Sequence, residues 1–259
     1  MQLQEVLYSQ GFGTRRVCAG LIQQGLVQTY TDSAAGQPLV CNDQATELVP
    51  DALRYRVQGV DWVYHALAYI MLHKPAHTEC SQKPSTYPSI YTLLPSPLRL
   101  RPNKGAVQGV QAVGRLDQDT TGLLVLSDDG QFIHRMGSPK KHLSKVYEVQ
   151  LKHHLDPSAV AQLLAGVVLD DDPRPVRAAA CEIVDIGGRA QHLRLTLTEG
   201  KYHQVKRMVA AVGNRVDGLH RSRIGGLDLP EDLAPGQWRW LGPEQLELLR
   251  PGPAQGGTE

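Results

Sequence analysis

Hydrophobic residues at the start of the chain follow a helical pattern. The first apolar face consists of Leu3, Val6 and Leu7. A second helix is expected in "TRRVCAGLIQQGLV", because Thr14 is placed to cap its N-terminus and Gly25 to end it. Residues 31–50 are polar and rich in turn-forming residues. We therefore expect a small N-terminal module of two short helices and a turn-rich segment, ending near Asp61.

The pattern then changes to short strands that alternate with helices. The segment "HALAYIMLHKP" (65–75) opens this part, and Pro75 ends it. Residues 123–127, "LLVLS", form a continuous apolar run that is typical of a buried strand. Segments 145–151 and 192–198 alternate apolar and polar residues with a period of two. This alternation favours antiparallel pairing with one buried face.

Two helices are expected in the same part of the chain. In "DPSAVAQLLAGV", Asp156 is placed as the cap, Pro157 in the first turn and Gly166 near the end. A later helix is expected from about Lys201 to Val212, with an apolar stripe facing the core. Polar residues lie on the helical face next to that stripe: His203, Lys206 and Arg207.

Composition restricts the class of protein only modestly. The 259 residues are 41% apolar, which is ample for a packed core in one or two domains. The net charge is +1, so no overall field attracts nucleic acid. Residues 1–61 carry four Lys or Arg and six Asp or Glu, whereas the rest of the chain carries 23 and 20. Basic contacts to a polyanion are therefore expected mainly after residue 61.

Targeting signals and cysteine pairs are not apparent in the sequence. No apolar run approaches the roughly 18 residues of a membrane-spanning helix, and the N-terminus does not resemble a signal peptide. The cysteines lie far apart and form no C-x-x-C pair: Cys18, Cys41, Cys80 and Cys181. A zinc site or a disulfide framework is therefore not expected. We expect a cytoplasmic monomer with no bound metal and no membrane partner.

The stretch "GRLDQDTTG" (114–122) carries the candidate chemistry. It matches the start of an EF-hand calcium loop, but position 12 is Asp128 in place of the usual Glu, and the second half of the loop is apolar. Asp117, Asp119 and Thr120 also form the D-x-D-x-T pattern of haloacid-dehalogenase-type phosphatases, although no buried strand leads directly into Asp117. The two aspartates can equally cap a turn before a strand. For this stretch by itself, these interpretations stay open.

The wider sequence resembles the pseudouridine synthases. "GRLDQDTTGLLVLSDDG" is similar to their central motif, most of all in the branch named for the small ribosomal subunit. Other segments resemble further family motifs in the expected order: "LHKP" (72–75), "SKVYEVQL" (144–151), "EGKYHQVKRMVAAVGNRV" (199–216), "LHRSRIGGLDL" (219–229) and "DLAPGQWRWL" (232–241). The segment "VLYSQGFGTRRVCAGLIQQGLV" (6–27) resembles the S4 RNA-binding domain of this branch. Several ordered motifs are far more specific than one D-x-D pattern.

The resemblance implies an α+β fold in three regions. Residues 1–61 are expected to form a small α/β S4-like RNA-binding domain. Residues 62–250 are expected to form the catalytic domain, with a mainly antiparallel bent sheet flanked by helices. Residues 251–259, "PGPAQGGTE", are expected to form a disordered tail.

The resemblance also implies catalytic roles for three residues. A synthase of this family isomerises uridine to pseudouridine without a cofactor, and its nucleophile is placed at Asp117. Lys206 is expected to pair with that carboxylate, since an adjacent cation favours its ionised form. Tyr147 is expected to stack on the target base and to help remove the proton from C5.

The remaining predicted site residues contact RNA. The target uridine must be flipped out of the folded RNA, and the resemblance places Arg115 in the space that it leaves. Basic residues within the matched motifs are expected to contact phosphates: Lys74, Lys201, His203, Arg207, Arg221 and Arg223. Arg15 and Arg16 match the basic helix start of the S4-like domain. The rest of that domain lacks positive charge, so we expect it to neutralise few phosphates.

The expected partner is ribosomal RNA, as small-subunit RNA or an assembly intermediate. By similarity, the target is 16S RNA, as for the synthases of uridine 516. Two alternatives remain: a 23S RNA synthase of the neighbouring branch, and an RNA-binding assembly factor without catalytic activity. The joint presence of Asp117, Tyr147 and Lys206 favours an enzyme, because RNA binding alone does not require this trio.

Overall fold

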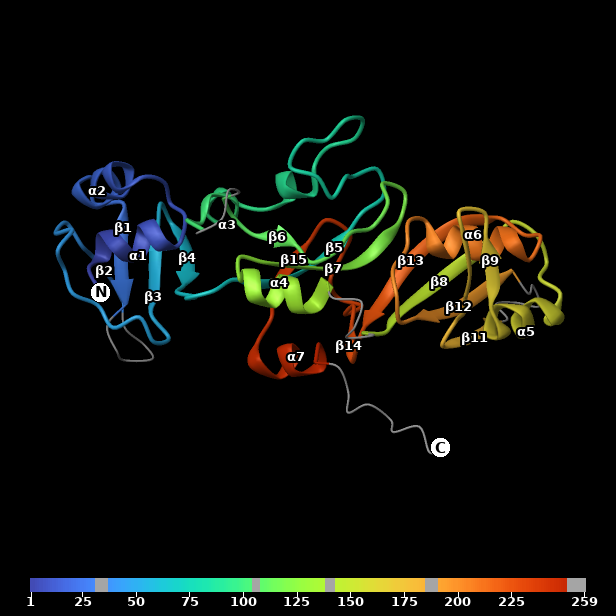
Figure 1. Cartoon of the computed structure of the whole chain (residues 1–259). Coiled ribbons are helices and arrows are strands. Elements are labelled where there is room, and N and C mark those ends of the chain that lie inside the picture. The colour runs from blue at the N-terminus through green and yellow to red at the C-terminus, as the bar shows by residue number, and fades with distance from the viewer. Residues whose placement is uncertain (31–36, 104–107, 138–142, 185–190, 251–259) are drawn as a thin grey trace. The chain divides into compact units, whose positions relative to one another are not determined.

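The computed structural model describes residues 1–30, 37–103, 108–137, 143–184 and 191–250 (Figure 1). The chain divides into two compact units. The first unit contains Met1–Ala68, Leu94–Gln111 and Ser127–Asp129. The second unit contains Tyr69–Leu93, Ala112–Leu126 and Gly130–Glu259. The tail predicted at 251–259 lies outside the described residues.

Within the described residues, the first unit holds two N-terminal helices and a four-stranded sheet. The helices are α1 (Leu3–Ser9) and α2 (Arg15–Gln23). Neighbouring strands of the sheet are antiparallel, in the order β2 (Pro38–Val40), β1 (Val27–Tyr30), β3 (Arg54–Val57) and β4 (Val60–Val63). The two predicted helices are confirmed. The Thr14 hydroxyl accepts a hydrogen bond from the Val17 N–H at 3.3 Å, as an N-cap does. Gly25 follows α2 with a φ of +70°, a conformation that ends helices.

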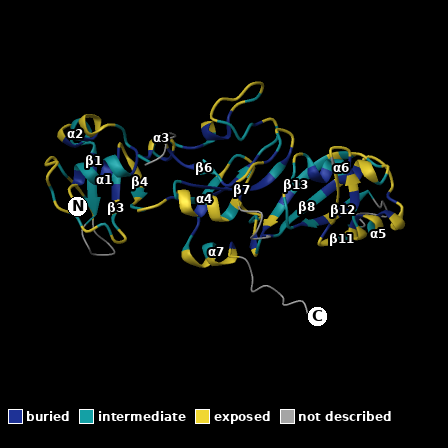
Figure 2. Cartoon of the chain, viewed as in Figure 1, coloured by how far each residue is buried: buried dark blue, intermediate teal, exposed yellow. Residues whose placement is uncertain are grey.

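An apolar cluster joins these helices to the sheet. Its buried members are Leu3, Val6, Leu7, Cys18, Ile22, Val27, Tyr55 and Val57. Strand alternation explains the contribution of β3, where Tyr55 and Val57 are buried and the intervening Arg56 lies on the opposite face. Figure 2 shows the same contrast between buried and exposed positions along the elements of this unit.

A buried ion pair draws residues 94–111 and 127–129 into the first unit. Arg101 follows the short helix α3 (Ser96–Leu100), and its Nε donates to the Asp128 carboxylate at 2.5 Å. The two side chains are only 3% and 6% exposed. The guanidinium also donates to the Gln10 side chain at 3.1 Å and to the His65 carbonyl at 2.7 Å. The observed division therefore differs from the predicted boundary near residue 61, because these contacts join segments that are distant in sequence.

The second unit is built on a sheet of nine strands within the described residues. The main strand order is β11 (Ala180–Val184), β12 (His192–Leu197), β8 (Lys145–Leu151), β13 (Val216–Ile224), β7 (Thr121–Ser127), β5 (Tyr69–Lys74) and β15 (Trp238–Trp240), with β14 (Leu227–Asp228) beside β13 and β6 (Gln111–Ala112) beside β7. The pairs β11–β12, β12–β8, β8–β13, β13–β14 and β5–β15 are antiparallel, whereas β13 and β7 are parallel. The predicted α+β fold with a mainly antiparallel sheet is confirmed.

Two apolar clusters cover different parts of this sheet. One joins β8 and β12 to α5 (Pro157–Ala165), α6 (Gln204–Ala211) and the hairpin of β9 (Val167–Leu169) and β10 (Asp172–Val176). The other joins β5 and β7 to α4 (Gly130–Gly137) and α7 (Pro243–Leu248). A short 3₁₀ helix, η1 (Ile90–Leu93), follows β5. No helix in the described parts of the chain is long and apolar enough to cross a membrane.

Helix α5 begins where the sequence predicts, whereas helix α6 does not. Asp156 caps α5 as predicted, accepting from the Ser158 N–H at 2.8 Å. Helix α6 begins at Gln204, three residues later than predicted, because His203 adopts a left-handed conformation with φ of +48°. His203 therefore lies outside the helical face on which we placed it.

We expect Arg101→Met to destabilise the first unit by roughly 3–5 kcal/mol, because it leaves the Asp128 carboxylate buried without its cation. The measurement is the unfolding midpoint of the full chain, followed by circular dichroism. Arg56→Met is the matched control, since the Arg56–Asp61 pair is solvent-exposed and should contribute little. Equal midpoints for the two variants would contradict the structural role of Arg101.

Candidate active site

The stretch 114–122 forms most of the loop between β6 and β7 and the first two residues of β7. Gly114 begins it with φ of +78°, and the Thr120 N–H donates to the Asp117 carbonyl at 3.1 Å in a tight turn. Gly122 ends the loop where β7 meets β13. A Cβ at Gly122 would lie 2.3 Å from the Arg221 carbonyl oxygen, so only glycine allows this close backbone approach.

A buried lysine fixes the loop through hydrogen bonds to its backbone. Lys74 has no exposed surface, and its Nζ donates to the carbonyls of Pro75, Gln118 and Thr120 at 3.1, 3.3 and 2.9 Å. Burial lowers the pKa of Lys74 below its ordinary value. The prediction that Lys74 contacts RNA phosphate is therefore wrong, because its ammonium group is used to fix the loop that carries Asp117.

Arg221 is also largely buried. It is 3% exposed, and its Nε donates to the Leu123 carbonyl at 2.8 Å, across the β7–β13 pair. Its Nη2 is buried and has no hydrogen-bond partner within the described residues. Arg221 nevertheless lines the cavity beside Asp117, and its contact with RNA phosphate stays a prediction.

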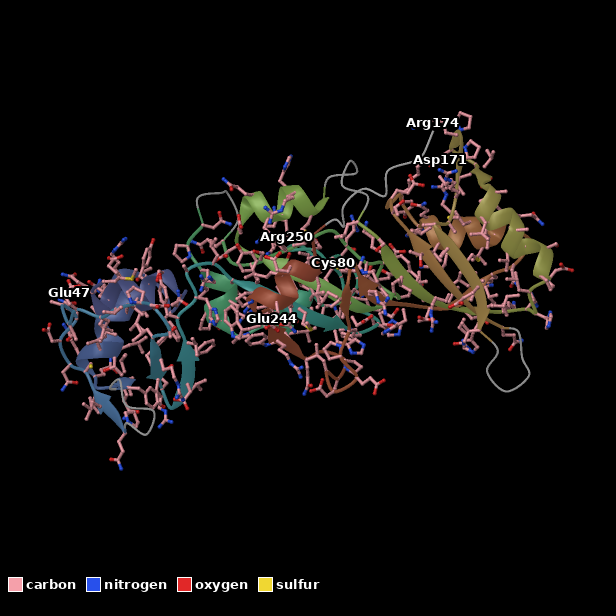
Figure 3. All side chains as sticks on the ribbon, turned by 90° about the horizontal axis from the view of Figure 1, so that it is seen from below. Glu47, Cys80, Asp171, Arg174, Glu244 and Arg250 are labelled. Atoms are coloured by element: carbon pink, nitrogen blue, oxygen red, sulfur yellow. The ribbon has the colours of Figure 1, made fainter. Side chains whose placement is uncertain are left out.

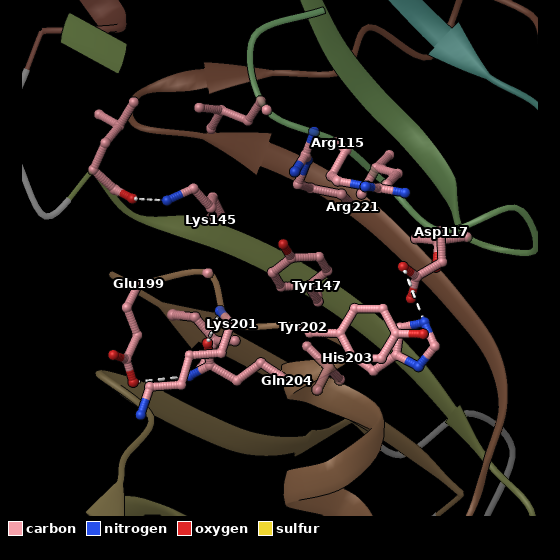
Figure 4. A pocket seen from close by; sticks show the side chains of 18 of the residues that line it. Arg115, Asp117, Lys145, Tyr147, Glu199, Lys201, Tyr202, His203, Gln204 and Arg221 are labelled. Atoms are coloured by element: carbon pink, nitrogen blue, oxygen red, sulfur yellow. Dashed lines mark hydrogen bonds and ion pairs between the residues drawn. The ribbon is translucent and has the colours of Figure 1, made fainter. Parts of the chain in front are cut away.

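Two basic side chains approach the Asp117 carboxylate. Lys206 Nζ lies 3.4 Å from Asp117 Oδ2. His203 Nε2 lies 3.4 Å from Asp117 Oδ1, and Figure 4 shows this pair. Lys206 is closer to Asp119, donating to its two carboxylate oxygens at 2.7 and 2.8 Å. Burial by itself raises the pKa of Asp119, but the hydrogen bond and charge of Lys206 outweigh it, so the pKa lies below its usual value. Lys206 thus lies near two carboxylates, whereas the sequence analysis paired it with Asp117 alone.

Asp117 borders a cavity of about 400 Å³. Lining residues come from the loop, β7, α4, β8, β12, the turn before α6, α6 itself and β13, and they include Arg115, Lys145, Tyr147, Lys201 and Tyr202. Tyr147 projects from β8 and is half-buried among these side chains in Figure 4. Lys145 donates to the Leu143 carbonyl at 2.9 Å, and burial, followed by the charge of Arg221, lowers the pKa of its ammonium group.

The structure brings the predicted catalytic residues to one cavity, together with some of the predicted RNA contacts. Asp117, Tyr147 and Lys206 line it, as do Arg115, Lys201 and His203. Arg115 is exposed at its edge. The arrangement combines a partly exposed carboxylate, adjacent cations and an aromatic ring in a space large enough for a nucleoside, which suits nucleophilic catalysis on a base-containing substrate.

The other predicted RNA contacts are not part of the cavity lining, and three of them form ion pairs. Arg207 forms an ion pair with Asp171 at the tip of the β9–β10 hairpin, labelled in Figure 3. Arg223 pairs with Asp228. In the first unit, Arg15 pairs with Glu5 at 2.8 Å, and Arg16 is exposed on α2.

Sequence reasoning missed Tyr202. It is 73% exposed, and its ring stacks on His203 with centroids 3.8 Å apart and planes at 18°. The signal available in the sequence was an aromatic residue directly before His203, within a matched motif. Its exposure was not predictable, because it depends on the left-handed turn at His203.

The described residues contain no group of three or more His, Cys, Asp or Glu arranged to hold a metal ion. Asp117 and Asp119 instead converge on Lys206. This arrangement does not support the calcium-loop interpretation of the stretch 114–122.

Comparisons with known proteins agree with this geometry. Residues 68–211 match the family model described as RNA pseudouridylate synthase. The chain is 42% identical over 178 residues to the ribosomal small subunit pseudouridine synthase A of Yersinia pestis, covering 69% of this chain and 71% of that protein. It is 35% identical over 250 residues to an uncharacterized RNA pseudouridine synthase of Bacillus subtilis (strain 168), covering 96% and 98%.

One solved structure is similar to this chain over nearly its whole length. It is described as the crystal structure of pseudouridylate synthase, with a TM-score of 0.63 and 32% identity over 96% of this chain and 99% of that one. The motifs around Asp117, Tyr147 and Lys206 thus lie in one cavity of a fold shared along the full length of a known synthase. The chain therefore belongs to the RNA pseudouridylate synthase family and is a pseudouridine synthase, an isomerase that acts on RNA.

Proposed function

We propose that this enzyme converts one uridine of small-subunit ribosomal RNA to pseudouridine, with Asp117 as the nucleophile. The observation that carries the proposal is the placement of the Asp117 carboxylate between Lys206 and His203, on the wall of a cavity that Tyr147 also lines. The choice of small-subunit RNA rests on relatives that are named for that subunit, such as the protein of Yersinia pestis. By the same similarity, the target is uridine 516 of 16S RNA.

The reaction is an isomerisation that balances without a cofactor. The bond between uracil N1 and ribose C1′ breaks, the base turns, and a bond forms between C5 and C1′. The proton lost from C5 is balanced by the proton gained at N1. Asp117 acts as the nucleophile on the flipped nucleotide and is released at the end, so the carboxylate is regenerated in each turnover.

Lys206 places a positive charge beside the nucleophile. Its Nζ lies 3.4 Å from Asp117 Oδ2 and is shared with Asp119. This cation offsets part of the cost of holding the Asp117 carboxylate in a cavity that bound RNA closes.

Tyr147 and Arg115 act on the flipped uridine and on the helix that it leaves. Tyr147 provides an aromatic face for the base and a phenol that assists in moving the C5 proton. Arg115 is exposed at the edge of the cavity and fills the position that the uridine vacates. Lys201 and His203, which line the cavity, contact the RNA backbone nearby.

The first unit acts as a weak S4-like RNA-binding domain, contacting RNA through Arg15 and Arg16 on α2. Arg15 is already paired with Glu5, and the surrounding sequence is poor in positive charge. Few phosphates are therefore neutralised by this unit. We further propose that the protein works as a cytoplasmic monomer.

We expect the loss of one carbodiimide-dependent primer-extension stop from 16S RNA in cells that lack the protein or carry Asp117→Asn. Removing a covalent nucleophile should lower turnover by more than about 10³-fold, whereas RNA binding should stay within a few-fold. A stop lost only from 23S RNA would move the target to the large subunit. An unchanged stop pattern together with retained RNA binding would favour a binding factor.

The neighbouring carboxylate gives a matched test of the nucleophile. Asp119→Asn removes the two short hydrogen bonds from Lys206 but leaves Asp117 in place. Since Asp119 is 56% exposed, we expect its loss to lower the single-turnover rate by about tenfold or less. If Asp119→Asn abolished turnover and Asp117→Asn retained it, the two roles would have to be exchanged.

A further inference from the structure

The exposed ring of Tyr202 is unusual for its surroundings. At 73% exposed it is the most accessible aromatic among the large exposed hydrophobic residues of the described chain. One of its faces is covered by the His203 ring, at 3.8 Å between centroids and 18° between planes. A parallel stack of this kind leaves the second face of Tyr202 open, beside the cavity that both residues line.

The stack leads directly to the nucleophile. His203 Nε2 lies 3.4 Å from Asp117 Oδ1, so Tyr202, His203 and Asp117 form a continuous series from solvent to the reacting carboxylate (Figure 4). Anything that stacks on the open face of Tyr202 is therefore held two side chains from the reaction centre. A base that neighbours a uridine bound at Asp117 is close enough in the RNA chain to reach this position.

The backbone beneath the ring is fixed before any ligand arrives. Gln204 is 4% exposed, and its side chain accepts from the Lys201 N–H at 2.8 Å and donates to Glu199 at 2.9 Å. The Arg207 guanidinium donates to the Tyr202 carbonyl at 3.1 Å. These bonds hold the turn in which His203 has its left-handed φ of +48°. Because the turn is already ordered, stacking on Tyr202 costs little conformational entropy.

The charge around the ring suits a nucleotide. Arg115, Lys201 and His203 line the same cavity and can face the phosphates that accompany a stacked base. Every nucleobase has a flat face, so stacking on tyrosine requires no particular base identity. Unpaired bases of RNA are commonly held on aromatic side chains in this way.

We propose that Tyr202 is an RNA-binding residue whose open face stacks on a nucleobase directly flanking the flipped uridine, extending the Tyr202–His203 stack that ends at Asp117. This inference rests on the proposed function, because it requires an RNA with a uridine in the cavity. It assigns to Tyr202 the positioning of the substrate and no part in bond making or breaking.

The test is single-turnover kinetics with the full chain and a 16S RNA transcript labelled with tritium at uridine C5. Removing one base–aromatic stack by alanine substitution weakens binding by roughly 1–3 kcal/mol, or about 5- to 150-fold. We expect Tyr202→Ala to raise the half-saturating RNA concentration within that range, with a maximal rate within about threefold of wild type. Tyr202→Phe keeps the ring and should behave as wild type.

An abasic substrate separates stacking from a structural effect. The base on the 5′ or the 3′ side of the target is removed, one at a time. On the side that stacks, the abasic RNA should weaken binding to the wild type by the same factor as Tyr202→Ala, and combining the two changes should cause no further loss. Losses that multiply on both sides, or a Tyr202→Ala protein that binds within twofold of wild type, would overturn the proposal.

The outcome is distinguishable from a failure of the proposed function. If the wild-type chain releases tritium from the transcript, the enzyme assignment stands and the Tyr202 comparison decides this inference alone. If the wild type releases tritium from no ribosomal RNA, the proposed function is contradicted and the inference falls with it. Because Tyr202 is largely exposed, its substitution should leave the circular dichroism spectrum unchanged.

Discussion

The active site depends on a buried ammonium group that no solvent reaches. Lys74 sits at the end of β5 and binds three carbonyl oxygens, two of which belong to the loop that carries Asp117. Burying a charge is costly unless hydrogen bonds satisfy it, and here the loop backbone supplies them. The loop is therefore held in one conformation by a group that would otherwise be strongly destabilising. The position of Asp117 follows from this interaction.

A second constraint acts from the other side of the loop. The parallel pair of β7 and β13 meets at Gly122, where the Arg221 backbone approaches too closely for any side chain. Since β13 follows α6 in the chain, this contact also fixes how the Lys206 helix stands relative to Asp117. The acid and its cation thus come from segments about 90 residues apart, and the sheet brings them together.

The electrostatics of the site rest on a shared lysine. Lysine presents a compact charge on a flexible stem, so one ammonium group can lie near several carboxylate oxygens, whereas the guanidinium group of arginine prefers one planar partner. Lys206 uses this freedom to lie near both Asp117 and Asp119. His203 adds a second nitrogen near Asp117 and stacks on the exposed ring of Tyr202. The segment 202–206 therefore carries the exposed ring and both basic side chains that approach Asp117.

The sequence alone indicated several of the elements and the proposed catalytic set, because these depend on local patterns and motifs. Period-two alternation, helix caps at Thr14 and Asp156, and the ordered motifs around Asp117, Tyr147 and Lys206 do not depend on distant contacts. Only the tertiary structure decided which cations face solvent. Lys74 and Arg221 look like phosphate ligands in the sequence, yet folding buries both. It also decided that Arg101 joins residues 94–111 to the first unit and that Tyr202 stands exposed. Burial and pairing are properties of residues that meet in space, and no local pattern records them.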